Sequence, residues 1–137
     1  MNKKITEING LQFYNGLVSG INNLLEYKNK LDEINVFPVP DGDTGTNMCF
    51  TLLPIVEECK SEVTIDISET MNIIADKALE SARGNSGTII AQFFHGMRKT
   101  TSKKKTLNIR DVSEALNQGF VSSKESLLKP EEGTIIT

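Results

Sequence analysis

Cysteine, histidine and long apolar runs are scarce in this chain, and each scarcity excludes a class of protein. No stretch of the 137 residues is long and apolar enough to span a membrane. The two cysteines, Cys49 and Cys59, fall in one predicted helix and lie too far apart along it to form a disulfide. A disulfide framework is therefore excluded, and we expect reduced thiols in a cytoplasmic protein.

Basic residues do not gather in any long block either. The net charge is -3, and the densest basic run, Lys103–Lys105, is typical of a solvated loop. We therefore predict no nucleic-acid partner. The only histidine, His95, lies within a predicted helix and is remote in sequence from the polar loops. We expect it at the edge of the core or on the surface, which argues against a serine–histidine hydrolase.

The chain does contain apolar sequence with a helical period, enough for one domain over residues 1–137. We predict an all-α fold with helices over about Ile5–Leu31, Thr44–Lys60, Asp66–Ala82, Gly87–Arg98 and Asn108–Leu128, the third and fifth capped by Asp66 and Asn108. Pro54 is expected to kink the second helix or break it in two. Phe50 is predicted to lie in the core, and Gly16 and Gly20 to allow close packing of the first helix.

The stretch from Asn35 to Met48, which reads N-V-F-P-V-P-D-G-D-T-G-T-N-M, organises the rest of the chain. Its prolines fix the backbone and push their predecessors towards extended geometry, and its glycines allow dihedral angles closed to other residues. We expect a rigid, sharply folded loop. Loops of this composition are commonly only solvated turns, but the apolar V-F-P-V-P run predicts a supporting wall beneath this one.

Two carboxylates one residue apart, Asp41 and Asp43, lie at the centre of this loop. Such a pair repels itself unless a cation lies between the oxygens, and hard oxygen ligands suit Mg²⁺ or Ca²⁺. The loop ends where a helix should begin, and a helix start with free N–H groups favours phosphate. We expect phosphate contacts there from Thr44, Gly45, Thr46 and Asn47. A metal site and a phosphate site on one loop predict nucleotide binding.

Three other motifs with similar residues do not fit this loop. An EF-hand loop beginning at Asp41 would need an oxygen ligand at position 45 and a glutamate at position 52, where the chain has Gly45 and Leu52. A P-loop needs glycine followed by lysine, and no glycine here precedes a lysine. The Asp-x-Asp loop of the haloacid dehalogenase type follows a buried strand, which Pro38 and Pro40 disfavour.

A second polar loop, R-G-N-S-G over residues 83–87, separates the third and fourth predicted helices. Gly84 can end the preceding helix, and Asn85 or Ser86 can cap the next one. Taken alone, this is an ordinary helix junction. Beside the loop of Asp41, it predicts a second phosphate cradle, because two facing helix starts can hold a polyphosphate. We expect its phosphate contacts from Gly84, Asn85, Ser86 and Gly87.

Three segments of the sequence resemble one family. They are the loop over residues 35–48, A-R-G-N-S-G over 82–87, and K-P-E-E-G-T-I-I over 129–136. Together they resemble the dihydroxyacetone kinase L-subunit-type nucleotide-binding domain family, and most closely the N-terminal ATP-binding domain of bacterial fatty acid kinase. Thr44 stands where dihydroxyacetone kinases often have histidine, and Asn35 lies near the place of their third aspartate. Both differences favour the fatty acid kinase branch.

The resemblance implies an up-and-down antiparallel helical barrel or bundle that is incomplete at the C-terminal end of this chain. Apolar faces left exposed would favour a homo-oligomer. The implied activity is that of an ATP-dependent phosphotransferase, in which Asp41 and Asp43 are catalytic and bind Mg²⁺ with help from the Asn35 amide. Gly133 and Thr134 are implied to join the binding of ATP or ADP.

The implied acceptor is a fatty acid carboxylate presented by a separate fatty-acid-binding protein, and the product is an acyl phosphate. Two alternatives stay open on the residues alone. One is a nucleotide-binding or scaffold module that has no catalytic activity on its own. The other is a dihydroxyacetone-type kinase domain, whose acceptor is a triose.

Overall fold

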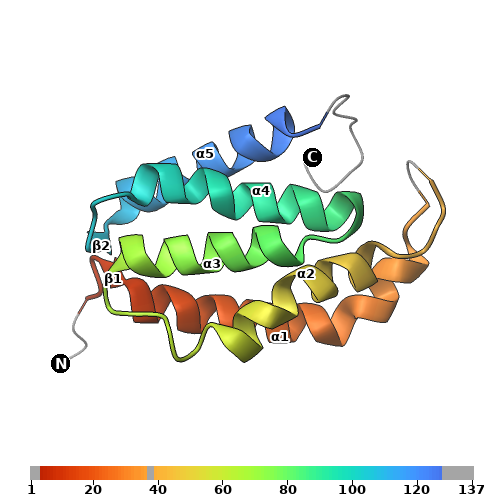
Figure 1. Cartoon of the computed structure of the whole chain (residues 1–137), viewed down its shortest axis with the longest axis horizontal. Coiled ribbons are helices and arrows are strands. Elements are labelled where there is room, and N and C mark those ends of the chain that lie inside the picture. Colours follow the sequence, from red (N-terminus) through yellow and green to blue (C-terminus); the bar gives the residue numbers. More distant parts are fainter. Residues whose placement is uncertain (1–3, 37–38, 128–137) are drawn as a thin grey trace.

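Five helices make up nearly all the regular structure in the part of the chain that the computed structural model describes, residues 4–36 and 39–127 (Figure 1). They are α1 (Gly10–Glu33), α2 (Thr44–Glu58), α3 (Ile67–Ser81), α4 (Gly84–Thr101) and α5 (Ile109–Glu125). The predicted all-α fold is confirmed. None of these described helices has the length and apolar character that crossing a membrane requires.

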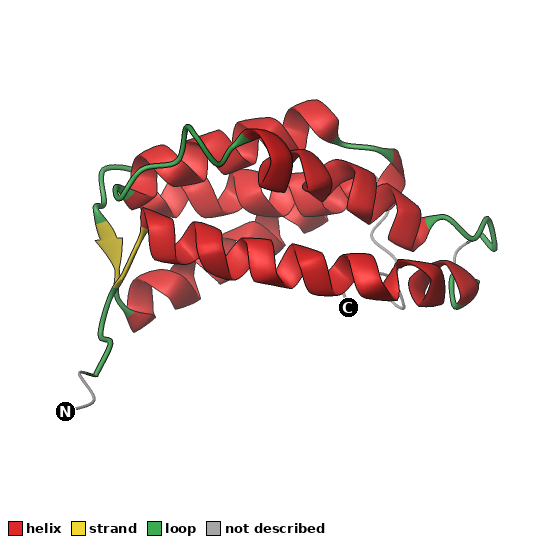
Figure 2. Ribbon diagram, turned by 90° about the horizontal axis from the view of Figure 1, so that it is seen from below, coloured by secondary structure: helices red, strands yellow, loops and turns green. Residues whose placement is uncertain are grey.

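Successive helices run in opposite directions, so their starts gather at two ends of the bundle (Figures 1 and 2). At one end, two short strands that the sequence did not predict, β1 (Ile8–Asn9) and β2 (Thr106–Leu107), pair antiparallel just before α1 and α5. The N–H of Ile67 donates to the Lys105 carbonyl at 3.1 Å and brings the start of α3 to the same end. The starts of α2 and α4 therefore lie together at the opposite end.

The starts of the helices are capped in two different ways. In α1, α3 and α5, the N-cap side chain accepts a hydrogen bond from the backbone N–H three residues later, which satisfies a donor that the helix leaves free. These caps are Asn9, Asp66 and Asn108, of which the last two were predicted. In α2 and α4, the N-cap residues Asp43 and Arg83 make no such side-chain bond. The two helix starts without their own caps are thus the two that share an end.

The core lies between α3 and the helices packed around it, α1, α2 and α4, and α5 packs mainly on α4. Its fully buried members include Ile55, Met71, Ile74 and Ala78. The hydroxyl of Tyr14 donates to the Ile55 carbonyl at 3.0 Å and satisfies an acceptor near the end of α2.

The prediction for Phe50 of α2 is wrong, and the prediction for Pro54 is decided only in part. The helix is continuous through Pro54, which excludes the predicted break into two pieces and not the alternative, a kink. Proline removes only one backbone hydrogen bond, and Leu52 and Ile55 on either side of it are buried in the core, which holds the helix together. Phe50 is not a core residue, because 53% of it is exposed. It lies on the side of α2 that faces the start of α4, where it contacts Arg83.

Gly16 and Gly20 do not mark a close helix contact. A methyl group added at either position would meet no atom within 4 Å, so the prediction of close packing is wrong. Glycine in an open helix interior costs stability because the unfolded chain has more backbone freedom to lose. We therefore expect Gly16→Ala and Gly20→Ala each to raise the free energy of unfolding by roughly 0.5–1 kcal/mol, measured by urea denaturation. If either substitution destabilised the protein, the space beside that glycine would not be open as the structure has it.

Candidate functional site

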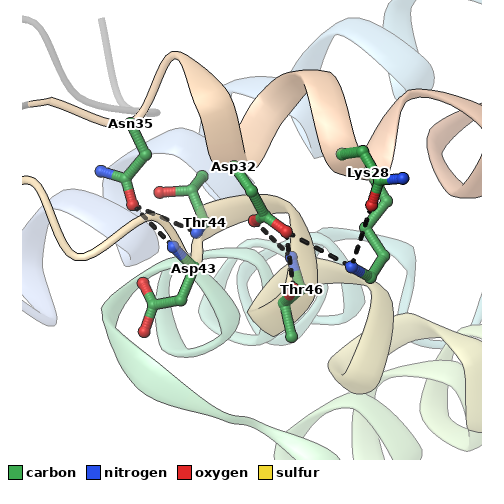
Figure 3. A network of polar contacts seen from close by, with 7 residues as sticks. Lys28, Asp32, Asn35, Asp43, Thr44 and Thr46 are labelled. Atoms are coloured by element: carbon green, nitrogen blue, oxygen red, sulfur yellow. Dashed lines mark hydrogen bonds and ion pairs between the residues drawn. The ribbon is translucent and has the colours of Figure 1, made fainter.

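The loop between α1 and α2 is fastened at its base by Asn35. Its side-chain oxygen accepts hydrogen bonds from the backbone N–H groups of Asp43, at 3.0 Å, and Thr44, at 3.2 Å (Figure 3). Gly42, which immediately precedes Asp43, has a φ of +66°, which glycine adopts without strain. The sequence predicted Asn35 as a metal ligand, but its oxygen is directed to these two N–H groups. In this structure Asn35 therefore positions the loop.

Asp32, at the end of α1, holds the first turn of α2. Its two oxygens accept hydrogen bonds from the backbone N–H of Thr46, at 2.9 Å, and from the Thr46 hydroxyl, at 2.7 Å (Figure 3). Lys28 pairs with the same carboxylate at 3.3 Å. Burial acts to raise the pKa of Asp32, but the hydrogen bonds from Thr46 and Lys28 outweigh it and leave that pKa below its usual value.

The contacts of Thr46 change its predicted role. Both its N–H and its hydroxyl are occupied by Asp32, so in this structure Thr46 has neither donor directed at a phosphate. The signal that sequence reasoning missed is that Asp32 closes the helix before the loop. A carboxylate at that position can reach the start of the next helix when the chain reverses direction.

The carboxylates of Asp41 and Asp43 take no part in holding the fold. Within residues 4–36 and 39–127, neither makes an ion pair, and the Asp43 side chain does not cap α2. Asp41 is exposed and Asp43 is half-buried. In Figure 3 the Asp43 carboxylate extends away from Asn35 and Asp32. Both acids are therefore available to a ligand.

The carboxylates of Asp41 and Asp43 fit one type of metal site and not another. No group of three or more acidic, histidine or cysteine side chains in the described part of the chain is arranged to hold a metal ion. An all-protein cage is therefore not formed there. Mg²⁺, however, is usually bound by one or two carboxylates together with waters and the phosphate oxygens of a substrate. Asp41 and Asp43 fit that shared arrangement.

The predicted apolar wall beneath this loop is not formed by its described members. Val36 is 70% exposed and Val39 is 58% exposed. Phe37 and Pro38 lie outside the described residues. The loop is held by polar contacts to its backbone, because Asn35 and Asp32 supply acceptors to N–H groups that the start of a helix leaves free.

The start of α4 is open. The helix begins at Gly84, three residues earlier than predicted, and neither Asn85 nor Ser86 caps it. The backbone N–H of Gly87 donates to the Arg83 carbonyl in the first helical bond. The N–H groups of Gly84, Asn85 and Ser86 have no hydrogen-bond partner among the described residues. Three free donors at the positive end of a helix form an anion-binding arrangement.

Thr51 joins this open start to α2. Its hydroxyl is fully buried, donates to the Asn47 carbonyl at 2.8 Å and accepts the N–H of Arg83 at 3.1 Å. Sequence reasoning missed Thr51, although a polar residue one turn after Asn47 on an otherwise apolar helix was a signal. Gly87 passes so close to Thr51 that an added methyl group would collide with its hydroxyl.

The side chain of Asn47 lies between the two helix starts. It packs against Gly84, where an added methyl group would collide with the Asn47 amide, and Gly84 has a φ of +66°. Asn47 is only 9% exposed, and its amide makes no hydrogen bond with any of the described residues. Among those residues no polar side-chain atom is fully buried without a partner, so the Asn47 amide still reaches solvent. An amide that reaches solvent beside three free N–H groups is available to a polar ligand.

A cation also lies at this place. The Arg83 guanidinium carbon is 4.4 Å from the centre of the Phe50 ring, a distance typical of a cation–π contact. Both residues are exposed, and Arg83 immediately precedes the free N–H groups of α4. The contact holds a positive charge beside the open helix start.

His95 is remote from this site and is engaged in another contact. Arg98 donates to its Nδ1 at 3.1 Å, and Asp76 of α3 pairs with Arg98. Partial burial, followed by the charges of Arg98 and Lys99, lowers the pKa of His95, which Asp76 opposes. The expected position at the edge of the core agrees with its half-buried state.

This lowered pKa predicts a dependence of stability on pH. Because the unfolded chain binds the His95 proton more readily than the folded chain does, the free energy of unfolding is unaffected by His95 well above pH 6.5. It falls as the pH is lowered from 6.5 towards the folded-state pKa, and the loss levels off below that pKa. Urea denaturation across this range should show the loss, and His95→Gln should remove it. An unchanged pH profile in His95→Gln would contradict the assignment. Asp32, Asp66 and Asp111, whose pKa values are also lowered, act only at more acidic pH.

Comparison with known proteins identifies the family. A family model described as the DAK2 domain matches residues 38–137, which include Asp41, Asp43 and the start of α4. The chain belongs to the DAK2 domain family. This is the dihydroxyacetone kinase L-subunit type of domain, whose members are nucleotide-binding domains of kinases. The dihydroxyacetone kinase L-subunit type of family, predicted from three segments of the sequence, is therefore confirmed.

The curated relatives extend well beyond this region. Uncharacterized proteins of Staphylococcus epidermidis (strain ATCC 12228 / FDA PCI 1200) and Staphylococcus aureus (strain USA300) are each 37% identical over 133 residues, or 97% of this chain. Those 133 residues are 24% of each relative. This DAK2 chain thus spans about a quarter of the length of the relatives it matches. Gly133 and Thr134, predicted to bind nucleotide, lie outside the described residues.

Proposed function

We propose that this DAK2 chain binds ATP or ADP with Mg²⁺ as the nucleotide-binding domain of a kinase that phosphorylates a fatty acid carboxylate. The observation that carries the proposal is the pairing of two helix starts without caps of their own, with the unpartnered Asn47 amide between them. Every other helix start in the described chain is capped by its own N-cap side chain. The exception therefore falls on the two helix starts whose loops, by the family resemblance, are expected to bind the phosphates.

The roles of the residues follow from their donors. The free N–H groups of Gly84, Asn85 and Ser86 would bind phosphate oxygens, and Asn47 would donate from its amide. Arg83 would offset part of the phosphate charge. Asp41 and Asp43 would hold Mg²⁺, which when bound neutralises the charge that develops on the β- and γ-phosphates. Phosphoryl transfer needs positioning and charge neutralisation more than a protein nucleophile.

The molecule that accepts the phosphoryl group is the more specific part of the proposal. A carboxylate oxygen of the fatty acid attacks the γ-phosphorus, the bond from that phosphorus to the β–γ bridging oxygen breaks, and ADP leaves, so that the product is an acyl phosphate. We propose that a separate fatty-acid-binding protein presents the acid, in line with the resemblance of the Asp41 loop to the fatty acid kinase branch. Thr44 and Asn35, where dihydroxyacetone kinases often have histidine and aspartate, support the same choice.

Calorimetric titration of the 137-residue chain with ADP, with and without Mg²⁺, tests the nucleotide part of this proposal. We expect saturable binding that Mg²⁺ strengthens, because the two acids repel the nucleotide until a cation joins them. GDP and adenosine serve as controls for the base and the phosphates. Absence of ADP binding by chain that retains its helical circular dichroism would overturn the proposal for this chain.

A second measurement separates kinase from binding module. ATP turnover is followed after addition of a fatty-acid-binding protein loaded with acid, and the acyl phosphate is trapped as a hydroxamate by hydroxylamine. Product formation supports transfer to a carboxylate. Mg²⁺-dependent ADP binding without any product would instead favour a module that binds nucleotide and has no catalytic activity on its own. Product formed only with dihydroxyacetone would favour the triose kinase.

A further inference from the structure

Two aspartates occupy the same position in two helices of this chain but behave differently. Asp66 precedes α3 with an extended backbone, φ -76° and ψ 121°, and its carboxylate accepts the N–H of Glu69 at 3.1 Å. Asp43 precedes α2 with φ -127° and ψ 7°, and its carboxylate makes no capping bond. Aspartate is among the strongest N-cap residues. The absence of a bond from Asp43 therefore needs a cause.

The cause is that another residue already occupies the capping place. In α2 the N–H three residues after the N-cap belongs to Thr46, and it donates to Asp32 at 2.9 Å. The Thr46 hydroxyl adds a second bond to the same carboxylate at 2.7 Å, and Lys28 holds it from the other side at 3.3 Å. Asp32 thus caps α2 from the end of α1, eleven positions before Asp43 in the sequence.

The backbone of Asp43 is held in the same way. Asn35 accepts the N–H groups of Asp43 and Thr44, so the first donors of α2 are also satisfied from the end of α1. Asn35 holds the backbone of Asp43, and Asp32 already caps the helix. The Asp43 carboxylate therefore makes no cap and extends away from Asn35 and Asp32 (Figure 3). A carboxylate that caps a helix points its oxygens at backbone N–H groups, and a carboxylate that binds a cation must point them elsewhere.

We propose that Asp32 is a positioning residue that caps α2 in place of Asp43 and thereby keeps the Asp43 carboxylate free for a divalent cation. This rests on the proposed function, because the cation is the one that accompanies the nucleotide. Asp32 itself makes no contact with the ligand. If Asp32 is removed, Asp43 is the nearest acid that can cap α2, and by capping it leaves the cation.

A double-mutant cycle on stability, without any metal, tests the exchange of caps. In the wild-type chain, Asp43→Ala should leave the urea midpoint unchanged, since Asp43 caps nothing. In the Asp32→Ala background, Asp43→Ala should lower the midpoint, since Asp43 then supplies the cap. Asp66→Ala is the matched control and should lower the midpoint in both backgrounds. Equal effects of Asp43→Ala in the two backgrounds would overturn the proposal.

Binding of Mn²⁺ in the presence of ADP, followed by electron paramagnetic resonance, gives the second readout. Asp32→Ala should weaken Mn²⁺ affinity by about tenfold or more, the usual size of an effect from a residue that supports a metal ligand. Asp32→Asn keeps an oxygen for the Thr46 N–H and should recover most of that loss. Unchanged Mn²⁺ affinity in folded Asp32→Ala would contradict the proposal.

The two measurements distinguish failure of the proposed function from failure of the role proposed for Asp32. If the wild-type chain binds no Mn²⁺ with ADP, the proposed function is wrong and the cation part of this inference falls with it. If the wild-type chain binds Mn²⁺ with ADP but Asp32→Ala binds it equally well and the stability cycle is additive, the proposed function stands and only the role of Asp32 is wrong.

Discussion

Replacing Asp41 and Asp43 together by asparagine is expected to abolish Mg²⁺-dependent binding of ADP and to leave the helical bundle folded. Neither carboxylate forms an ion pair or a cap within the described residues, so the fold loses nothing with their charges. Asparagine keeps the size of each side chain and removes the charge that a hard cation requires. We expect calorimetry with Mg²⁺ to show affinity for ADP lowered by more than about a hundredfold, or about 2.7 kcal/mol.

A matched control removes the same number of charges elsewhere. Glu33 and Glu62 are exposed acids, the first near the loop and the second at the other end of α2. Glu33→Gln/Glu62→Gln should bind ADP with nearly the affinity of the wild-type chain, because long-range charges at an exposed surface are screened by salt. If the control variant loses as much affinity as the double asparagine variant, the effect is one of net charge and not of a cation site at Asp41 and Asp43.

The Gly45→Ala substitution is expected to give the largest loss of stability among single changes near the site. Gly45 is buried in the first turn of α2, where an added methyl group would collide with the Lys28 carbonyl and lie 2.9 Å from Cβ of Leu31. The carbonyl belongs to the backbone of α1 and cannot rotate away. Such overpacking costs about 3 kcal/mol in the free energy of unfolding, which urea denaturation measures.

The same collision predicts an effect on the site. The added methyl group would lie 3.1 Å from an oxygen of Asp32, the residue that caps α2. Moving α2 away from α1 to relieve the collision would lengthen the bonds from Thr46 to Asp32. Gly20→Ala, in an open part of α1, is the control for the change of residue type and is expected to stabilise. A Gly45→Ala chain as stable as the wild type would show that the two helices are not packed this closely.

Local signals in the sequence were enough for most of the fold. The spacing of apolar residues located all five described helices, and Asp66 and Asn108 were recognised as caps because an N-cap bonds within its own first turn. The errors came from contacts between distant segments. The pairing of Ile8 with Leu107 that forms β1 and β2 joins segments 99 positions apart in the sequence, and neither two-residue segment has a pattern of its own.

The features of the functional site likewise divide into those that local sequence predicted and those that depend on contacts between distant segments. The composition of the two loops indicated carboxylates, small residues and helix starts, and these loops carried the family resemblance that the DAK2 match confirms. The roles of Asp32, Asn35 and Thr51 were not predicted, since each depends on a partner eight to 32 positions away. Sequence patterns of helical period report neighbours within a turn or two and not the residues that face them from another helix.

By itself, the sequence of this DAK2 chain determined where its helices lie, which residue types its two loops present, and its family. Only the tertiary structure decided that the starts of α2 and α4 lie together, that the Asn47 side chain packs against Gly84 between them, and that Asp32 and not Asp43 caps α2. The physical reason is that a helix and its own cap form from local bonds. Which of several acids fills the capping place, and which remains free for a ligand, depends on how two antiparallel helices approach each other.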